Sequence, residues 1–416
     1  MHPNRGSVLV VRYSPDGERV VACDSPGRVI QVWDAATGRQ LTRIDAGRGY
    51  RAVSLSPDGK TVYVPREESK MTPFEKDGKK MVRLEMDGDV RAWDLDTGEL
   101  RATFQHTPPR GILILTLAPD GSTFTTGEEL AGEWERGKEQ QKFTASLWDV
   151  KTGQFRPLPV HPGGAAYSPD GRTIAGTAYD DDGFATAVKL FDVGTAEETR
   201  SIPIAEEGVR AGGLTFSPDG KLLVGRVVRV RPQQPHALQV WLKFWDVAAG
   251  REVASFSREV GTGLSGLTFS PDGKVLAAAI AHIANWRGKP AELLLFDVPG
   301  RKLAKTLILG EKPGEDERSI VRDFAFSPQG EWLAVITQAI PELPGNEELS
   351  AEETPQPRVH LIDVAGGEVR ETLVMPPSFP RSMCFSPDGK TLATGGNGKV
   401  LLWDLTEPPG TSPDEP

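Results

Sequence analysis

Short apolar runs alternate with turn signals along the whole chain. Runs such as Val8–Tyr13 and Leu264–Phe269 are rich in branched and aromatic residues, and each is followed by a cluster containing Ser, Pro, Asp and Gly. A second short run, such as Arg19–Cys23 or Thr391–Thr394, comes directly after the cluster. Runs of this length between such breakers are typical of antiparallel strands. The pattern therefore predicts an all-β protein.

One tetrapeptide separates these runs eight times. It reads Ser-Pro-Asp-Gly, with Ala118 and Gln329 as the substitutions, and begins at positions 14, 56, 118, 168, 217, 270, 327 and 386. Proline fixes φ at the second position, Asp can bond its own backbone, and Gly supplies a positive φ. Each copy is therefore predicted to be a tight turn between two antiparallel strands, and the chain is predicted to be a repeat protein.

A second motif, an apolar residue followed by Asp, accompanies every tetrapeptide. The pairs are Trp33-Asp34, Trp93-Asp94, Trp148-Asp149, Phe191-Asp192, Trp245-Asp246, Phe296-Asp297, Ile362-Asp363 and Trp403-Asp404. A third strand ends at each Asp, and a Thr-Gly turn, as at 37–38, leads into a fourth strand such as Arg39–Ile44. Each unit is thus predicted to be a four-stranded antiparallel meander, with strands named a, b, c and d.

Sheets that are apolar on both faces bury them by stacking radially, so we expect a β-propeller of eight blades. Over residues 7–405 the paired motifs resemble the WD40 repeat family in a divergent, bacterial form, and some units resemble YVTN-type propeller repeats. The resemblance implies that each Trp packs between blades and that each Asp orders a turn. It implies no activity, because a propeller is a platform. Only His106 and His161 match the family's His position, so we expect its buried Trp–Ser/Thr–His–Asp network in few blades, if any.

The ends of the chain predict an incomplete last blade. We expect one domain over 7–405 and a Pro-rich tail over 406–416, which contains four prolines that cannot donate to a ladder. Met1–Gly6 is too short for a d strand, so blade 8 should have three strands and an open edge carrying Lys399, Leu401 and Trp403. Such an edge can pair with another chain, including a second copy. The alternatives are that the tail shields it or that the natural chain begins upstream.

Insertions mark one end of the blades. The a–b and c–d turns are short, whereas the b–c connections vary in length, and the face that they share with the d–a loops is the expected binding face. Because Trp and Arg dominate binding hot spots, we predict contacts with a protein or peptide there. In the alternative, both tryptophans fold back onto their own hairpins and the arginines pair with neighbouring Glu. The candidates are Phe74 in a hairpin expected over Pro65–Gly88, Trp134 in blade 3, Arg226, Arg229 and Arg231 in blade 5, and Trp286 beside Arg287 in blade 6.

Charge, hydropathy and cysteine content indicate which partners, which cellular location and which disulfides to expect. A balance of 48 basic and 58 acidic side chains gives a net charge of −10, which disfavours a nucleic-acid partner. The apolar runs are far too short to cross a membrane or to form a signal peptide, so we expect a cytoplasmic protein. Cys23 and Cys384 are too few for a disulfide framework. They lie in blades that become neighbours on closure, so one disulfide is the alternative to two buried thiols.

Catalytic motifs are not evident in the sequence. The six His residues are scattered without metal-ligand spacing, and no nucleophile elbow or P-loop occurs. The Asp run at 180–182 before Gly183 is an expected turn, although it also suggests Ca²⁺. We therefore expect a non-enzymatic protein-interaction scaffold with no cofactor and no metal. The alternative is a propeller hydrolase or lactonase-like enzyme with a metal at the axial mouth.

Overall fold

The computed structural model describes residues 8–24, 29–47, 53–135, 143–229, 238–260, 262–282, 288–310, 317–341, 355–376, 382–396 and 399–406. These residues form strands and turns, and no helix among them is long and apolar enough to span a bilayer. The chain divides into two compact units, which we describe separately. The first holds 1–13, 183–185 and 205–416, and the second holds 14–182 and 186–204.

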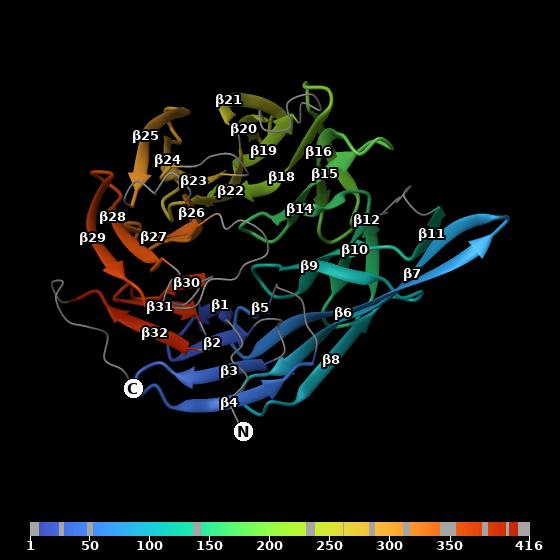
Figure 1. Ribbon diagram of the computed structural model, residues 1–416, viewed down its shortest axis with the longest axis horizontal. Helices are drawn as coiled ribbons and strands as arrows, with labels where there is room; N and C mark the ends of the chain where they lie inside the picture. The colour runs from blue at the N-terminus through green and yellow to red at the C-terminus, as the bar shows by residue number, and fades with distance from the viewer. Residues whose placement is uncertain are drawn as a thin grey trace. The chain divides into compact units, whose positions relative to one another are not determined.

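The first four sheets follow the predicted meander (Figure 1). Blade 1 consists of β1 (Val8–Tyr13), β2 (Arg19–Asp24), β3 (Val29–Asp34) and β4 (Gln40–Asp45). Blade 2 consists of β5 (Ser54–Leu55), β6 (Thr61–Lys76), β7 (Lys79–Asp94) and β8 (Leu100–Gln105). Blade 3 consists of β9 (Gly111–Leu117), β10 (Thr123–Glu129), β12 (Phe143–Asp149) and β13 (Phe155–Leu158), and its insertion contains β11 (Gly132–Glu135). Blade 4 consists of β14 (His161–Tyr167), β15 (Thr173–Tyr179), β16 (Ala185–Asp192) and β17 (Glu198–Pro203).

The last four sheets repeat the same order (Figure 1). Blade 5 consists of β18 (Val209–Phe216), β19 (Leu222–Arg229), β20 (Leu238–Asp246) and β21 (Arg251–Val260). Blade 6 consists of β22 (Thr262–Phe269), β23 (Val275–His282), β24 (Ala291–Asp297) and β25 (Lys302–Leu309). Blade 7 consists of β26 (Glu317–Phe326), β27 (Trp332–Pro341), β28 (Arg358–Asp363) and β29 (Glu368–Val374). Blade 8 consists of β30 (Ser382–Phe385), β31 (Thr391–Gly396) and β32 (Lys399–Asp404).

The sheets confirm the predicted fold class. Seven blades have the four strands a to d in antiparallel order, and within the described residues the eighth has three. β32 therefore lies at the edge of its sheet, as the sequence predicted. In one respect the sheets differ from the expectation, because blade 2 gains a fifth strand, β11, from the insertion in blade 3.

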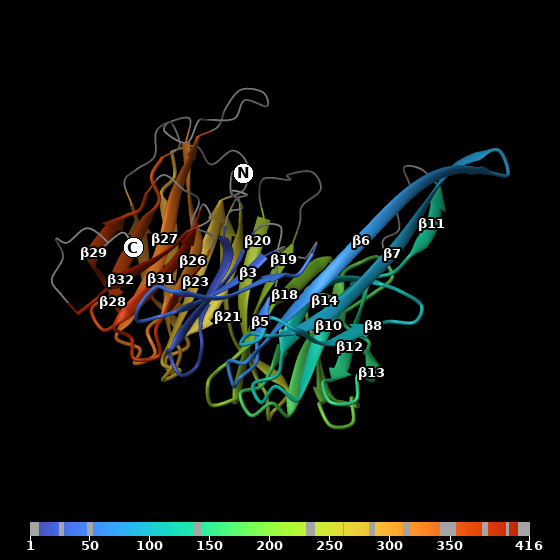
Figure 2. The same ribbon diagram turned by 90° about the horizontal axis from the view of Figure 1, so that it is seen from below.

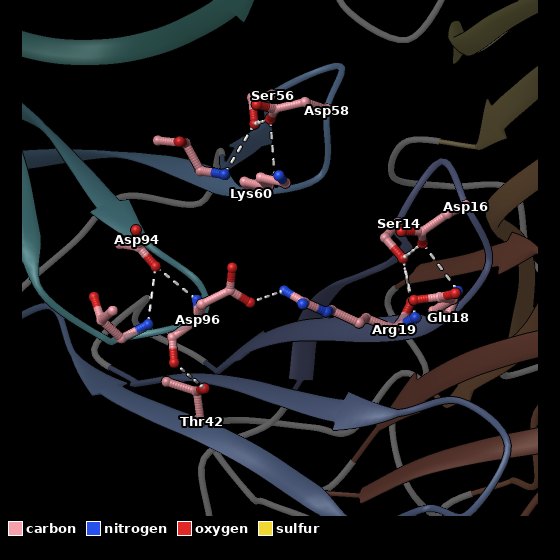
Figure 3. Close-up of polar contacts among 12 residues, drawn as sticks. Ser14, Asp16, Glu18, Arg19, Thr42, Ser56, Asp58, Lys60, Asp94 and Asp96 are labelled. Atoms are coloured by element: carbon pink, nitrogen blue, oxygen red, sulfur yellow. Dashed lines mark hydrogen bonds and ion pairs between the residues drawn. The ribbon is translucent and has the colours of Figure 1, made fainter.

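The repeated tetrapeptides form the a–b turns that their composition predicted. In the first, the Ser14 hydroxyl donates to Asp16 at 2.5 Å and accepts the N–H of Arg19 at 2.9 Å, while Asp16 also accepts the N–H of Glu18. Figure 3 shows this turn beside its counterpart at Ser56 and Asp58. The glycines that end these turns have φ near +70°, as at Gly17 with 77°, which explains why Gly occupies the position.

The hydrophobic core lies between consecutive sheets within each unit. In the second unit, Val21 and Ile30 of blade 1 pack with Val62 of blade 2. In the first unit, Phe244 of blade 5 packs with Phe296 of blade 6, with ring centroids 6.2 Å apart. Within each unit, consecutive sheets thus bury their faces against one another, which is the physical reason for stacking the repeats.

The thiol groups are free in this structure. Burial raises the pKa of Cys23 to about 12, and burial likewise raises the pKa of Cys384 to about 12. The disulfide between Cys23 and Cys384, which the sequence left open as an alternative, is therefore not formed. Both side chains remain protonated and unreactive at neutral pH.

Candidate protein-binding site

The insertion in blade 2 is an ordered β-hairpin. β6 and β7 pair continuously from Thr61 opposite Asp94 to Lys76 opposite Lys79. The turn residues Asp77 and Gly78 have φ of 53° and 74°, as a two-residue hairpin turn requires. β8 pairs with β7 only as far as Asp89, so the hairpin continues past strands β5 and β8 of its blade, and β11 lies beside its outer part (Figure 2). We call residues 66–89 together with β11 the arm, and residues 66–89 confirm the hairpin predicted over Pro65–Gly88.

Trp134 is part of the arm. β11 pairs with the outer half of β7, which places Trp134 opposite Val82. The Trp134 side chain is 7% exposed and packs against Leu84 and Met86. It therefore stabilises the arm and is not presented to solvent. The sequence left two possibilities, an exposed binding anchor or a tryptophan folded back on its own hairpin. The structure is closer to the second, except that Trp134 packs on the hairpin of the preceding blade.

The base of the arm is fixed by charged groups and by a close backbone approach. The Arg66 guanidinium contacts Asp89 at 2.9 Å, Asp87 at 3.2 Å and Glu68 at 3.4 Å, and the hydrogen bond to Asp89 is the main reason why the pKa of Arg66 is raised. A Cβ atom at Gly88 would lie 2.4 Å from the Arg110 carbonyl oxygen. Only glycine lets the arm lie this close to the chain that enters β9.

Phe74 lies near the end of the arm and is half-buried. The Arg83 guanidinium lies 5.1 Å from the centroid of the Phe74 ring, a cation–π distance. Arg83 also forms an ion pair with Glu133 of β11 at 2.7 Å. Both contacts tie β11 and β6 to β7, so the three strands of the arm hold one another in place.

The blade 5 arginines bond to backbone carbonyls. Arg226 is exposed and donates to the carbonyl oxygen of Leu264. Arg229 donates to the carbonyl oxygen of Glu207 at 3.3 Å and lies 5.3 Å from the Trp241 ring centroid. Their binding role stays a prediction. Arg231, Trp286 and Arg287 lie outside the described residues.

The repeated Asp residues close the c–d turns. Asp94 accepts the N–H groups of Asp96 and Thr97, and the hydrogen bond from Thr97 is the first reason why the pKa of Asp94 falls to about 2. Asp34, Asp149 and Asp246 accept N–H groups of their c–d turns in the same way, and Asp404 accepts the N–H of Thr406 after the last strand. Figure 3 shows that the same turn also meets blade 1, where Arg19 forms an ion pair with Asp96 at 2.5 Å.

The paired aromatic residues are buried to different degrees. Trp148, Trp245 and Trp403 are buried, whereas Trp33 and Trp93 are half-buried. Trp148 packs with Phe104 of blade 2 and Phe124 of its own blade. Trp403 packs with Met383 of its own blade and Ile336 of blade 7. The packing between blades that the resemblance implies is thus visible at these two residues.

Blade 3 contains a buried polar network at His106, one of the two His positions that the sequence singled out. Trp148 donates its indole N–H to Thr126 at 2.8 Å, Thr126 donates to Glu128 at 2.5 Å, and Glu128 meets His106 at 2.7 Å. The acid is Glu128 on strand b, where the resemblance implies an Asp. The available signal was the spacing of Thr126 and Glu128, because residues two apart on a strand share a face.

The described His, Cys, Asp and Glu side chains can be checked for a metal site. Among the described residues, no three His, Cys, Asp or Glu side chains are grouped as a metal site would require. His360 bonds to Thr337 at 2.8 Å and Thr372 at 3.0 Å, and burial lowers the pKa of His360 to about 4. His360 is therefore a neutral, hydrogen-bonded core residue at physiological pH.

Comparisons with known proteins agree with this geometry. Residues 373–404, which run from the end of β29 through β30, β31 and β32, match the WD40 family described as "WD domain, G-beta repeat". The chain is 23% identical over 430 aligned positions to "Periodic tryptophan protein 2" of Arabidopsis thaliana, covering 96% of this chain and 40% of that protein. It is 28% identical over 222 positions to "Hydrazine synthase subunit beta" of Kuenenia stuttgartiensis, covering 49% of this chain and 55% of that protein. The chain thus spans about half or less of the length of these relatives.

A solved structure gives the same fold. A chain of "Kuenenia stuttgartiensis Hydrazine Synthase" superposes with a TM-score of 0.53 at 19% identity, over 98% of this chain and 97% of that one. At this identity the likeness establishes the fold alone. The structure thus has the propeller fold, and one of its repeats, at 373–404, matches the WD40 family.

Proposed function

We propose that this WD40-type propeller is a non-enzymatic scaffold that binds a protein or peptide at the b–c and d–a ends of its blades. The observation that supports this most directly is the arm. Two blades contribute strands to it, and its only described apolar cluster is small, consisting of Leu84, Met86 and Trp134 with Val82 packed against it. Such a protrusion adds little to burial within the blade while its backbone is ordered at an entropic cost. Docking of a partner would explain why the arm is ordered despite this entropic cost.

The names of the relatives support an assembly role. One of them is a "subunit beta", so that protein works as part of a larger complex. Propellers serve as platforms because their connecting loops vary while the sheets stay constant. For this chain, membership of an assembly remains part of the proposal.

The test is affinity capture from the native lysate with two versions of the protein. In the second version, residues 69–86 are replaced by Asn-Gly and Trp134 by Gln, so that the shortened hairpin leaves no exposed tryptophan. Thermal unfolding must first show that both versions fold. We expect a stoichiometric partner with the wild type and its loss without the arm.

The other outcomes are equally decisive. A partner retained without the arm would keep the scaffold function and move its site to another insertion. If the wild type retains no partner, the scaffold proposal fails. Metal analysis of the purified protein would then test the hydrolase or lactonase-like alternative.

A further inference from the structure

We propose that the outer part of the arm, residues 70–83, docks an acidic segment of the partner protein that also carries apolar side chains. We call these residues the arm tip. The inference rests on the proposed scaffold function and specifies the partner's chemistry. Charge is the first argument. Residues 70–83 have five basic residues and two acidic ones, which gives +3, and Glu133 and Glu135 of the adjacent β11 reduce this to +1, whereas the whole chain carries −10.

The lysines of the tip are available to a ligand. Lys70, Lys76 and Lys80 are exposed, and within the described part of the chain none of the three forms an ion pair. Arg83 differs, because its guanidinium already contacts Glu133 and Phe74. The tip thus contains unpaired positive charge on a support that is itself fixed by ion pairs. A carboxylate-rich partner would complement it and would be steered to it over long range.

Apolar side chains lie among these lysines. Met71 is 60% exposed opposite Leu84 on one face of the hairpin, and Phe74 lies opposite Met81 on the other face. Methionine adapts its shape to different partners and is common on such binding surfaces. A purely ionic ligand would leave Met71 in water, so the best-fitting segment combines carboxylates with apolar residues.

The free edge of β6 points to docking through side chains. A two-residue turn makes Lys76 and Lys79 a hydrogen-bonded pair, so Pro73, opposite Val82, occupies a non-hydrogen-bonded position. The nitrogen of Pro73 therefore faces the edge of β6 away from β7. Because it has no hydrogen to donate, it would break the hydrogen-bond ladder to an added strand. The hairpin keeps its own ladder, while extension of the sheet by a partner is blocked at this point.

A nucleic acid fits the tip less well than an acidic protein segment. Glu75 and Asp77 lie between the lysines, and each would repel phosphates from the same surface. The net charge of the remaining chain adds to this repulsion. An acidic peptide is repelled too, but its apolar side chains gain contacts with Met71 on one face of the hairpin or with Phe74 on the other, and a phosphate backbone lacks these contacts.

The experiment uses a fluorescein-labelled synthetic peptide that repeats Glu-Glu-Leu, and its binding is followed by fluorescence anisotropy. The tip variant is Lys70→Gln, Lys76→Gln, Lys80→Gln. The control variant, Lys151→Gln, Lys221→Gln, Lys274→Gln, has the same change in net charge at exposed lysines on turns of other blades. Thermal unfolding verifies that both are folded. We expect the dissociation constant to rise about tenfold in the tip variant and less than about twofold in the control.

Further ligands test the chemistry. A peptide with Gln in place of Glu, and one with Ser in place of Leu, should each bind at least about fivefold more weakly than the parent. The inference is overturned if the wild type does not bind the acidic peptide, if both variants weaken binding equally, or if a short single-stranded RNA depends on the tip lysines and the peptide does not. If the tip variant captures as much of the lysate partner as the wild type does, the role of the arm tip is overturned, while the scaffold function stands.

Discussion

His106 and Glu128 meet in the interior of blade 3, where Nε2 of the imidazole lies 2.7 Å from Oε1 of the carboxylate and both side chains are 0% exposed. Burial alone would raise the pKa of Glu128. The hydrogen bonds from His106, Thr126 and Arg110 outweigh that effect and lower the pKa, so the carboxylate is ionised when the protein is folded. Ser146 donates a further hydrogen bond at 3.1 Å. The charge is stable there because these donors replace the lost water.

Replacing this carboxylate should destabilise the protein strongly. Glu128→Gln removes the charge that His106 and Arg110 face, and breaking a buried pair in this way typically costs about 3 kcal/mol. Urea unfolding followed by fluorescence measures the change. The matched control is Glu133→Gln, whose ion pair with Arg83 is solvent-exposed and should contribute about 0.5 kcal/mol. Similar losses for both variants would show that the network does not stabilise the fold as described.

The fold could be predicted from the sequence because its signals are local. Ser14 and Asp16 form their turn from residues within six positions, and Asp34 does the same with Thr37. Because each sheet can have neighbours on both faces, its central strands are buried at consecutive positions, as Thr123 to Glu128 of β10 are. Eight repetitions of these local signals were sufficient to give the blades and their order.

The candidate site was harder to predict because its contacts are long-range in sequence. β11 belongs to blade 3 by position, yet it pairs with β7 about fifty residues earlier, as the Arg83–Glu133 separation of 50 shows. No local pattern contains that pairing. A partial signal was present, since Trp134 between Glu133 and Glu135 has the alternation of a strand with one buried face. We interpreted this tryptophan as an exposed anchor, whereas it is buried.

The base of the arm depends on the missing side chain at Gly88. In Gly88→Ala the new Cβ would lie 2.4 Å from the Arg110 carbonyl oxygen and 3.1 Å from that of Arg66, so the backbone must move. We expect a loss of about 2 kcal/mol and faster amide hydrogen exchange over residues 66–89 than elsewhere. Gly132→Ala is the control, because its Cβ would meet nothing closer than 3.8 Å. Unchanged exchange in the arm of the Gly88 variant would contradict the close approach.

His360 should make stability depend on pH above the range in which the turn carboxylates titrate. Burial lowers the pKa of His360 from 6.5 to about 4, so between these values the unfolded chain binds a proton that the folded chain does not. Stability is therefore fully present above pH 6.5 and falls as the pH drops toward 4, by at most about 3 kcal/mol. Chemical unfolding from pH 7.5 to 4 measures this slope. His360→Gln should flatten it, and an identical slope in the variant would assign the pH dependence to other groups.

The edge of blade 8 leads to a prediction about self-association. β32 pairs with β31 on one side, and no other described strand pairs with it. Lys399 is exposed and Leu401 half-buried, while Trp403 is covered by the core. A second copy can add its own β32 to this edge, because two such edges are related by a two-fold axis when they pair in antiparallel fashion. We therefore expect the protein to form dimers as its concentration rises.

Sedimentation velocity over a range of concentrations measures this association. Leu401→Lys introduces a charge into the edge and should shift the dimer to higher concentration by at least about tenfold, whereas Leu401→Val keeps an apolar strand-forming residue and should not. A chain ending at residue 406 tests whether the residues after 406 shield the β32 edge. If they do, their removal should strengthen dimerisation. If the wild type and the shortened chain are both monomeric at every concentration, the edge is not a self-association site. Shielding by the tail would then not explain the lack of pairing, because the shortened chain has no tail.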